Sequence, residues 1–155
     1  MRYYFSKEDC NELQEEITNI RKRVKEIGQE MGASCREGAE TFHDNFAFED
    51  GERQQQILTK RYIELRRVFE NAIVVKKVDQ KEKVAFGNIV KYKDLNSNEE
   101  KIVEIGSYMI LRKYRGNLIS YNSPLGKLLL GAEEGEIKKG KIAGKINEIE
   151  ILNIL

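Results

Sequence analysis

The sequence lacks the features that define several large classes of protein. Its 155 residues contain one proline and two cysteines. A single proline argues against a long disordered segment, and two cysteines without a C-x-x-C spacing argue against a disulfide framework or a zinc site. No apolar run approaches the roughly 20 residues that a membrane-spanning helix requires. We therefore expect a soluble chain that is rich in regular structure and has no membrane partner.

A clear excess of positive charge is also absent. The chain has 27 lysines and arginines against 26 acids, for a formal net charge of +1. Attraction of a whole protein to phosphates needs a positive excess, so the composition argues against a generally basic nucleic-acid binder. The first ten residues, MRYYFSKEDC, lack the apolar core of a secretory signal, which favours a cytoplasmic protein.

Charge is nevertheless uneven along the chain. Between residues 37 and 52 there is no lysine or arginine, and the six acidic side chains of this segment are Glu37, Glu40, Asp44, Glu49, Asp50 and Glu52. The segment separates two stretches with the apolar spacing of paired helices. The acids are therefore predicted to lie at the turn of a long helical hairpin.

A narrow apolar stripe predicts each arm of the hairpin. Ser6 and Asp9 have the spacing of a capping box, so the first helix is expected to begin there. Apolar residues then recur at alternating steps of three and four, which keeps one stripe facing a partner helix. The first stripe is Cys10, Leu13, Ile17, Ile20, Val24, Ile27 and Met31, and the second is Leu58, Tyr62, Leu65, Phe69 and Ala72. We expect the stripes to pair within one chain, a monomer, although a coiled-coil dimer fits the same spacing.

Basic residues flank both stripes. They include Arg21, Arg23, Arg53, Arg61 and Arg66. We interpret them as solvated flanks and as partners of ion pairs between the two helices, in preference to a groove for nucleic acid.

The second half predicts a small sheet domain, because short apolar runs broken by turn residues replace the helical period after Val78. The expected domains are residues 1–76 and 77–155, and the expected class is α+β. The predicted strands cover 84–92, 102–105, 108–113, 118–121 and 148–154, with turns at 94–98, 115–117 and 138–141. Ser123 and Pro124 can begin a short helix that Gly131 ends. This helix would pack its leucines onto an antiparallel sheet.

Several segments resemble the bacterial Gre transcript-cleavage factors. The most specific is NLISYNSPLGKLLLG at 117–131, followed by EEGE at 133–136 and the closing strand EIEILNIL. VAFGNIV, KIVEIG and HDNFAFEDGERQQ are similar to further parts of the family, in the family's own order. The resemblance implies an antiparallel coiled-coil hairpin followed by a small FKBP-like antiparallel β-sheet domain with one short helix.

The resemblance also implies a mechanism. Family members bind bacterial RNA polymerase with the globular domain, where the matching residues are Ser120, Asn122, Ser123, Pro124 and Leu125. They insert the hairpin through the secondary channel, and the tip acids help to hold a second Mg²⁺ ion shared with the polymerase active site. The polymerase then cuts the 3′ end of the backtracked nascent RNA. The factor is thus expected to stimulate another enzyme and to catalyse nothing alone, with carboxylates as suitable ligands for Mg²⁺.

The tip departs from the family pattern Gly-Asp-x-x-Glu-Asn-x-x-Tyr. Aligned without gaps, this pattern falls on Glu40, Thr41, Asp44, Asn45 and Phe48. Asp44 keeps the second acid, Thr41 replaces the first, and Glu40 adds an acid one position earlier. Residues 40 and 44 share one face of a helix, so Asp44 and Glu40 are predicted to be the tip carboxylates that hold Mg²⁺.

Three functions fit the sequence. The first is an elongation factor that stimulates cleavage. The second is a secondary-channel regulator or inhibitor that inserts the hairpin without cutting, which Thr41 permits. The third is a coiled-coil interaction protein unrelated to the polymerase active site. A prolyl isomerase is disfavoured, because a fold does not carry a function.

Overall fold

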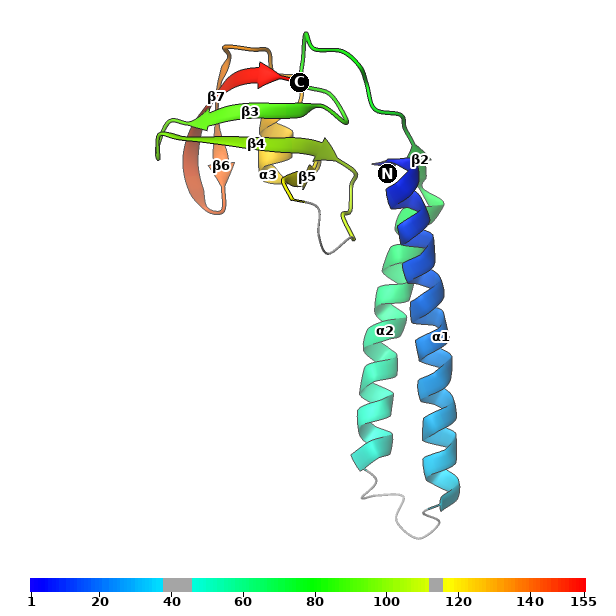
Figure 1. The fold of residues 1–155 in the computed structure, drawn as a ribbon. Helices are drawn as coiled ribbons and strands as arrows, with labels where there is room; N and C mark the ends of the chain where they lie inside the picture. Colours follow the sequence, from blue (N-terminus) through cyan, green and yellow to red (C-terminus); the bar gives the residue numbers. More distant parts are fainter. Residues whose placement is uncertain (38–45, 112–115) are drawn as a thin grey trace. The chain divides into compact units, whose positions relative to one another are not determined.

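The structure is a computed structural model that describes residues 1–37, 46–111 and 116–155 (Figure 1). Two compact units divide the chain: one comprises Met1–Cys10 with Ala72–Leu155, and the other comprises Asn11–Asn71. Contacts thus group the first ten residues with the carboxy-terminal part. The division at residues 76 and 77 stays a prediction.

Helix α1 (Lys7–Glu37) begins where the capping pattern predicted. The Ser6 hydroxyl accepts a hydrogen bond from the Asp9 amide at 3.1 Å and donates one to Asp9 Oδ2 at 2.8 Å. These bonds satisfy an amide of the first turn that has no acceptor within the helix. The predicted start of the first helix is confirmed.

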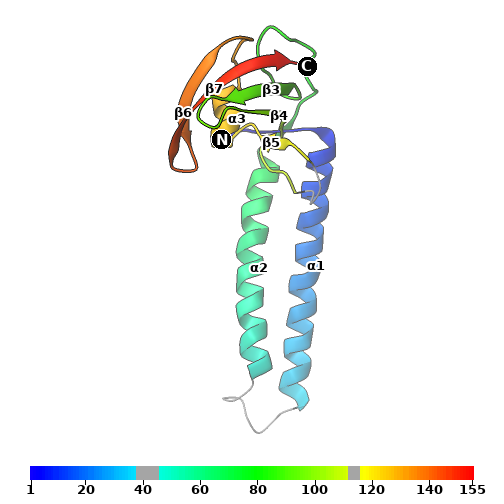
Figure 2. The ribbon, with the colours of Figure 1, turned by 60° about the vertical axis from the view of Figure 1, so that its left-hand side comes forward.

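Helix α2 (Phe46–Glu70) lies beside α1 in both views of the ribbon (Figures 1 and 2). Of the stripe residues, Leu13, Ile20, Ile27 and Leu65 are buried, and Ile17, Val24, Met31, Leu58, Tyr62 and Phe69 are half-buried. The Gln55 side chain donates a hydrogen bond to the Val24 carbonyl at 3.3 Å. The predicted hairpin within one chain is confirmed, and a narrow apolar seam holds it together.

Two short strands precede and follow the hairpin. β1 (Tyr3–Phe5) pairs in parallel with β2 (Ala72–Val74). Ala72 was predicted to lie on the second helical stripe, and this was wrong because α2 ends at Glu70. Three-residue strands that pair across about 70 positions leave no local periodicity in the sequence.

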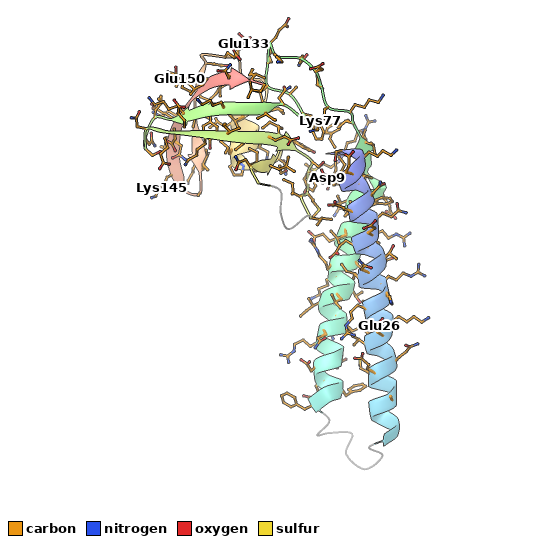
Figure 3. All side chains as sticks on the ribbon, in the orientation of Figure 1. Asp9, Glu26, Lys77, Glu133, Lys145 and Glu150 are labelled. Carbon is orange, nitrogen blue, oxygen red and sulfur yellow. The ribbon has the colours of Figure 1, made fainter. Side chains whose placement is uncertain are left out.

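A buried polar network fastens the start of α1 within the first unit. Asp9, labelled in Figure 3, is 3% exposed, and its Oδ2 accepts a hydrogen bond from the Ser107 hydroxyl at 2.6 Å. The Ser107 hydroxyl in turn accepts one from the Ser6 amide at 2.8 Å. The Tyr108 amide donates to the Tyr4 carbonyl at 3.0 Å. Hydrogen bonds of this kind offset the cost of burying a carboxylate.

Five strands form the main sheet, in the order β5-β4-β3-β7-β6. They are β3 (Ile89–Asp94), β4 (Glu99–Gly106), β5 (Leu118–Ser120), β6 (Ile137–Ile142) and β7 (Lys145–Ile154). Neighbouring strands pair antiparallel except β4 and β5, which are parallel. The predicted α+β class is confirmed, with one parallel pair in a sheet expected to be antiparallel throughout.

Three predicted boundaries in the sheet domain were wrong. Residues 138–141 belong to β6, and the turn falls instead at Ala143 and Gly144, which both have positive φ angles. The lysines of this segment suit an edge strand as well as a turn. Residues 84–88 precede β3 and form no strand. They form a turn in which the Asn88 side chain accepts a hydrogen bond from the Ala85 amide and donates two, to the carbonyls of Val78 and Gln80. Residues 108–111 form no strand, and 112–113 lie outside the described residues.

Helix α3 (Pro124–Leu129) packs on the sheet and completes its core. Leu129 is fully buried among residues of the strands, and Leu125 and Leu128 pack against the same cluster. The cluster includes Val90, Tyr92, Val103, Ile105, Ile149 and Ile151. No helix in the described part of the chain is both long and apolar enough to cross a membrane.

Truncation of Ile27 tests how far the hairpin depends on its seam. Ile27 is 2% exposed in α1, whereas Ile63 is 60% exposed in α2. We expect Ile27→Ala to lower the free energy of unfolding by about 2–4 kcal/mol, because the change leaves a cavity in the seam. Ile63→Ala is the matched control and should change it by less than about 0.5 kcal/mol. Thermal unfolding followed by circular dichroism measures both, and equal effects would contradict the packing described.

Candidate functional site

The predicted tip carboxylates Glu40 and Asp44 lie outside the described residues, and so does Thr41. The structure describes α1 up to Glu37 and α2 from Phe46. Of the six acids predicted to lie at the turn, Glu37 ends α1, whereas Glu49, Asp50 and Glu52 belong to α2, so the prediction was wrong for these four. The geometry of the pair Glu40 and Asp44 stays a prediction.

Acids in the first turns of α2 are arranged differently from a metal site. Both oxygens of the Asp50 carboxylate are engaged, one by Arg53 Nη2 at 3.0 Å and the other by Gln54 Nε2 at 2.6 Å. Among residues that the structure describes, no group of three or more histidines, cysteines and acids could hold a metal ion. The Asp50 carboxylate thus takes part in hydrogen bonds and an ion pair on the surface of α2.

The basic flanks of the hairpin form ion pairs along the surface of each helix. Arg23 contacts Glu26 at 3.4 Å and Glu30 at 3.2 Å, and Glu26 is labelled on α1 in Figure 3. On α2, Arg66 Nε contacts Glu70 at 2.9 Å. These side chains are largely exposed, so each pair contributes little to stability. The exposure of these side chains agrees with solvated flanks, but the ion pairs of Arg23, Arg53, Arg61 and Arg66 each join residues of one helix, and not the two helices as predicted.

The serine-proline segment is held by its own hydrogen bonds. The Ser123 hydroxyl accepts from the Gly126 amide at 3.0 Å and donates to the Ser120 carbonyl at 2.7 Å. The Ser120 hydroxyl donates to the Tyr108 carbonyl at 2.8 Å and accepts from the Asn122 amide at 3.1 Å. Ser123 is the N-cap of α3 and Pro124 occupies its first turn, as predicted. Both serine hydroxyls are thus used inside the fold.

Pro124 is the exposed member of the predicted contact residues. Asn122 and Leu125 are half-buried, and Leu125 packs against the core. The five predicted contact residues therefore lie together on one turn and the start of α3. Their contact with a partner stays a prediction.

Gly126 is a residue that the sequence reasoning missed. A Cβ at this position would lie 2.1 Å from the Ser120 carbonyl oxygen, so only glycine fits between α3 and the preceding turn. Gly131, by contrast, has a φ of +77° and ends the helix as predicted. Gly126 is part of the S-P-x-G sequence, but the sequence alone does not indicate that its Cα lies close to the Ser120 carbonyl.

Tyrosines surround this segment. The ring of Tyr108 lies 4.3 Å from that of Tyr3 and 6.4 Å from that of Tyr121, between ring centroids. The Tyr121 hydroxyl accepts a hydrogen bond from the Tyr4 amide at 3.2 Å. Burial raises the pKa of Tyr121 above its ordinary value.

The chain matches known proteins over both of its parts. The model of a family described as "Transcription elongation factor, GreA/GreB, C-term" matches residues 79–155. The chain is 30% identical over 152 residues to the transcription elongation factor GreA of Chloroherpeton thalassium, covering 97% of this chain and 95% of that protein. It is 28% identical over 155 residues to GreA of Clostridioides difficile, covering 98% of this chain and 95% of that protein.

Solved structures are more distant. GreA factor homolog 1 (Gfh1) of Thermus thermophilus is 20% identical with a TM-score of 0.43, covering 100% of this chain and 99% of that one. The elongation factor GreA/GreB of Nitrosomonas europaea is 22% identical with a TM-score of 0.39, covering 66% of this chain and 89% of that one. Neither likeness carries information about function.

The full-length matches and the carboxy-terminal family model together define the class as a transcription elongation factor. The chain belongs to the GreA/GreB family.

Substitution of Gly126 tests the close approach behind α3. We expect Gly126→Ala to destabilise the sheet-containing unit by at least about 2–3 kcal/mol, because the added methyl group overlaps the Ser120 carbonyl. Gly32→Ala is the control, since a Cβ there meets nothing within 4 Å. It should be neutral or should stabilise α1 by up to about 1 kcal/mol. Urea unfolding of the two variants makes the comparison, and a stable Gly126→Ala protein would rule out the close contact.

Proposed function

We propose that this chain stimulates cleavage of backtracked RNA by bacterial RNA polymerase. The observation that supports this most directly is the 30% identity to a GreA protein over 97% of the chain, because the match includes the hairpin as well as the sheet. The hairpin would enter the secondary channel of the polymerase and bring the tip acids to its active site. Membership of the family disfavours an interaction protein that has no link to the polymerase.

Two tip residues would carry the chemistry. Asp44 and Glu40 are the carboxylates that would hold Mg²⁺ together with the polymerase, and carboxylate oxygens are ligands that this ion prefers. A second Mg²⁺ ion held there would supply activation of the attacking water and stabilisation of the displaced oxygen. Asp50 is not a candidate ligand, because Arg53 and Gln54 engage both of its oxygens. The chain lends ligands and performs no reaction alone.

The globular part would provide the attachment to the polymerase. The surface formed by Ser120, Asn122, Ser123, Pro124 and Leu125 is the proposed contact. Because the serine hydroxyls bond within the fold, they would shape this surface, and the exposed Pro124 would touch the partner. We propose that the chain acts as a monomer in the cytoplasm.

A second candidate function follows from Thr41. Threonine supplies no negative charge where the family pattern has its first acid, so the hairpin could occupy the channel and regulate or inhibit the polymerase without cutting. A halted, backtracked elongation complex separates the two functions. RNA shortening that depends on Mg²⁺ supports cleavage, binding without shortening supports the regulator, and absence of binding contradicts both.

Replacement of Asp44 tests the role of the tip. We expect Asp44→Ala to slow Mg²⁺-dependent RNA shortening on the order of 100-fold, because loss of one ligand removes charge and positioning at the reacting phosphate. Asp50→Asn is the control, and it should leave the shortening rate within about twofold because Asp50 has its own partners. Gel analysis of labelled RNA measures the rates. Equal rates for wild type and Asp44→Ala would exclude Asp44 as the ligand.

Restoration of the family's first acid tests the importance of Thr41. If Glu40 substitutes poorly for that acid, Thr41→Asp should raise the shortening rate by about tenfold or more, since catalysis is sensitive to displacements of about 1 Å. Thr41→Asn, which is similar in size and uncharged, is the control and should give no gain. A rate unchanged by Thr41→Asp would mean that the pair Glu40 and Asp44 is already complete.

A further inference from the structure

Gln55 differs from its two neighbours in the run of three glutamines on α2. Gln54 and Gln56 are exposed, and Gln54 donates a hydrogen bond to Asp50 of the same helix at 2.6 Å. Gln55 is half-buried, and its Nε2 donates to the Val24 carbonyl oxygen of α1 at 3.3 Å. Gln55 therefore joins the two helices by a directional polar contact within a seam of mainly apolar side chains.

Gly28 leaves the space through which Gln55 reaches α1. A Cβ on Gly28 would lie 3.2 Å from Gln55 Nε2, so a side chain at this position would press the amide away from the carbonyl. Gly51 is also at a close approach, because a Cβ there would lie 2.7 Å from Met31 Cγ of α1. A Cβ on Gly32, by contrast, would meet nothing within 4 Å. The helices therefore approach each other closely around Gln55.

The apolar seam alone does not fix how far one helix lies along the other. Its residues recur every three or four positions, so a shift by one turn, roughly 5 Å, again places apolar side chains opposite each other. Apolar burial is also non-directional. A polar side chain in such a seam specifies one alignment, because other alignments separate the half-buried amide from its acceptor.

We propose that Gln55 is a positioning residue that sets the alignment of α1 with α2 and, through it, the place of the tip acids. The inference rests on the proposed function, which gives those acids a task at the polymerase active site. Residues 38–45 are joined to Glu37 of α1 and Phe46 of α2, so the offset between these two ends follows from the alignment. Catalysis is sensitive to displacements of about 1 Å, so a small shift of one helix would slow cleavage. The proposed attachment to the polymerase lies in the other unit and would be unaffected.

A hydrogen bond that only stabilised the hairpin would predict a different result. The Val24 carbonyl lies within α1, where the helix itself supplies a donor, so removal of the Gln55 amide leaves no unsatisfied group there. Gln55→Met keeps the length of the side chain, loses the donor and adds apolar surface to the seam, so it should fold as the wild type does. Gly28→Ala displaces the amide and raises the helix propensity of α1. A positioning role therefore predicts slower cleavage by variants that are as stable as the wild type or more so.

The kinetic test compares the full-length protein with Gln55→Met and Gly28→Ala. The matched controls are Gln56→Met and Gly32→Ala. Each protein is titrated against halted, backtracked elongation complexes, which gives a saturated rate of RNA shortening and a half-saturating concentration. We expect the two test variants to lower the saturated rate about 3- to 30-fold and to keep the half-saturating concentration within about twofold. The controls should keep both values near wild type, and both glycine variants should unfold at or above the wild-type temperature.

A distance measurement reports the alignment in the free protein. Spin labels are placed at exposed positions, Gln29 on α1 and Thr59 on α2, in a background whose two native cysteines are replaced. Double electron–electron resonance should give one narrow distribution for this background. Gln55→Met should shift or broaden that distribution, whereas Gln56→Met should leave it unchanged. The result does not depend on whether the chain stimulates cleavage.

Other outcomes overturn the proposal. A saturated rate of Gln55→Met within twofold of wild type, or a distance distribution that it leaves unchanged, would exclude the positioning role. A higher half-saturating concentration at an unchanged saturated rate would show that Gln55 affects attachment instead. If Gln55→Met unfolds at a much lower temperature, Gly28→Ala decides, and a wild-type rate for it would exclude the role. In all these cases the wild type still shortens RNA, so the proposed function stands, whereas absence of shortening by the wild type overturns both.

Discussion

The narrow apolar seam between α1 and α2 is the constraint on which the hairpin depends. Only about one residue per turn of each helix is available to bury, with Leu13, Ile20, Ile27 and Leu65 at its centre. Most of the remaining positions are polar, and several of their charged side chains form ion pairs within each helix, which contribute little to stability. A long hairpin with so thin a core keeps its outer faces mostly polar, although Phe46, Ile57 and Ile63 of α2 are exposed. Mostly polar faces suit an element that is surrounded by water and that, under the proposed function, would enter a channel of the polymerase.

In the sheet-containing unit, hydrogen bonds and a glycine hold the short turn before α3 in a fixed shape. Ser120 and Ser123 form hydrogen bonds to backbone groups. Because Gly126 has no side chain, α3 can lie close to the Ser120 carbonyl of the turn. The polar residues of this motif therefore build its shape. A contact with the polymerase through this surface would depend on shape and on the exposed Pro124 more than on the serine hydroxyls themselves.

The sequence predicted the elements whose signals are local or repeated. The heptad stripes predicted both long helices, and Ser123 with Pro124 predicted α3 at its residue bounds. The sequence patterns did not reveal strands that pair with residues distant in sequence, or strands whose composition also fits a turn. β1 and β2 are too short to show alternation, and their pairing joins residues on either side of the hairpin. The lysines and the glycine of β6 are typical of a turn. In the structure Gly140 lies in the strand, where a Cβ would lie 2.9 Å from the Leu128 side chain. The charge pattern predicted where the candidate tip lies, whereas the exposure of Phe46 required the helical packing to be known.

The residues needed to enter a channel and the residues needed to cut RNA are different sets in this chain. Entry would depend on the seam and on the outer faces of α1 and α2, which are mostly polar. Cutting would depend on anionic oxygens at the tip, where Thr41 supplies none and Glu40 is one position earlier in the sequence with a longer side chain. A longer side chain loses more conformational entropy when it is fixed, so we expect Glu40 to be a weaker ligand than an aspartate at position 41 would be.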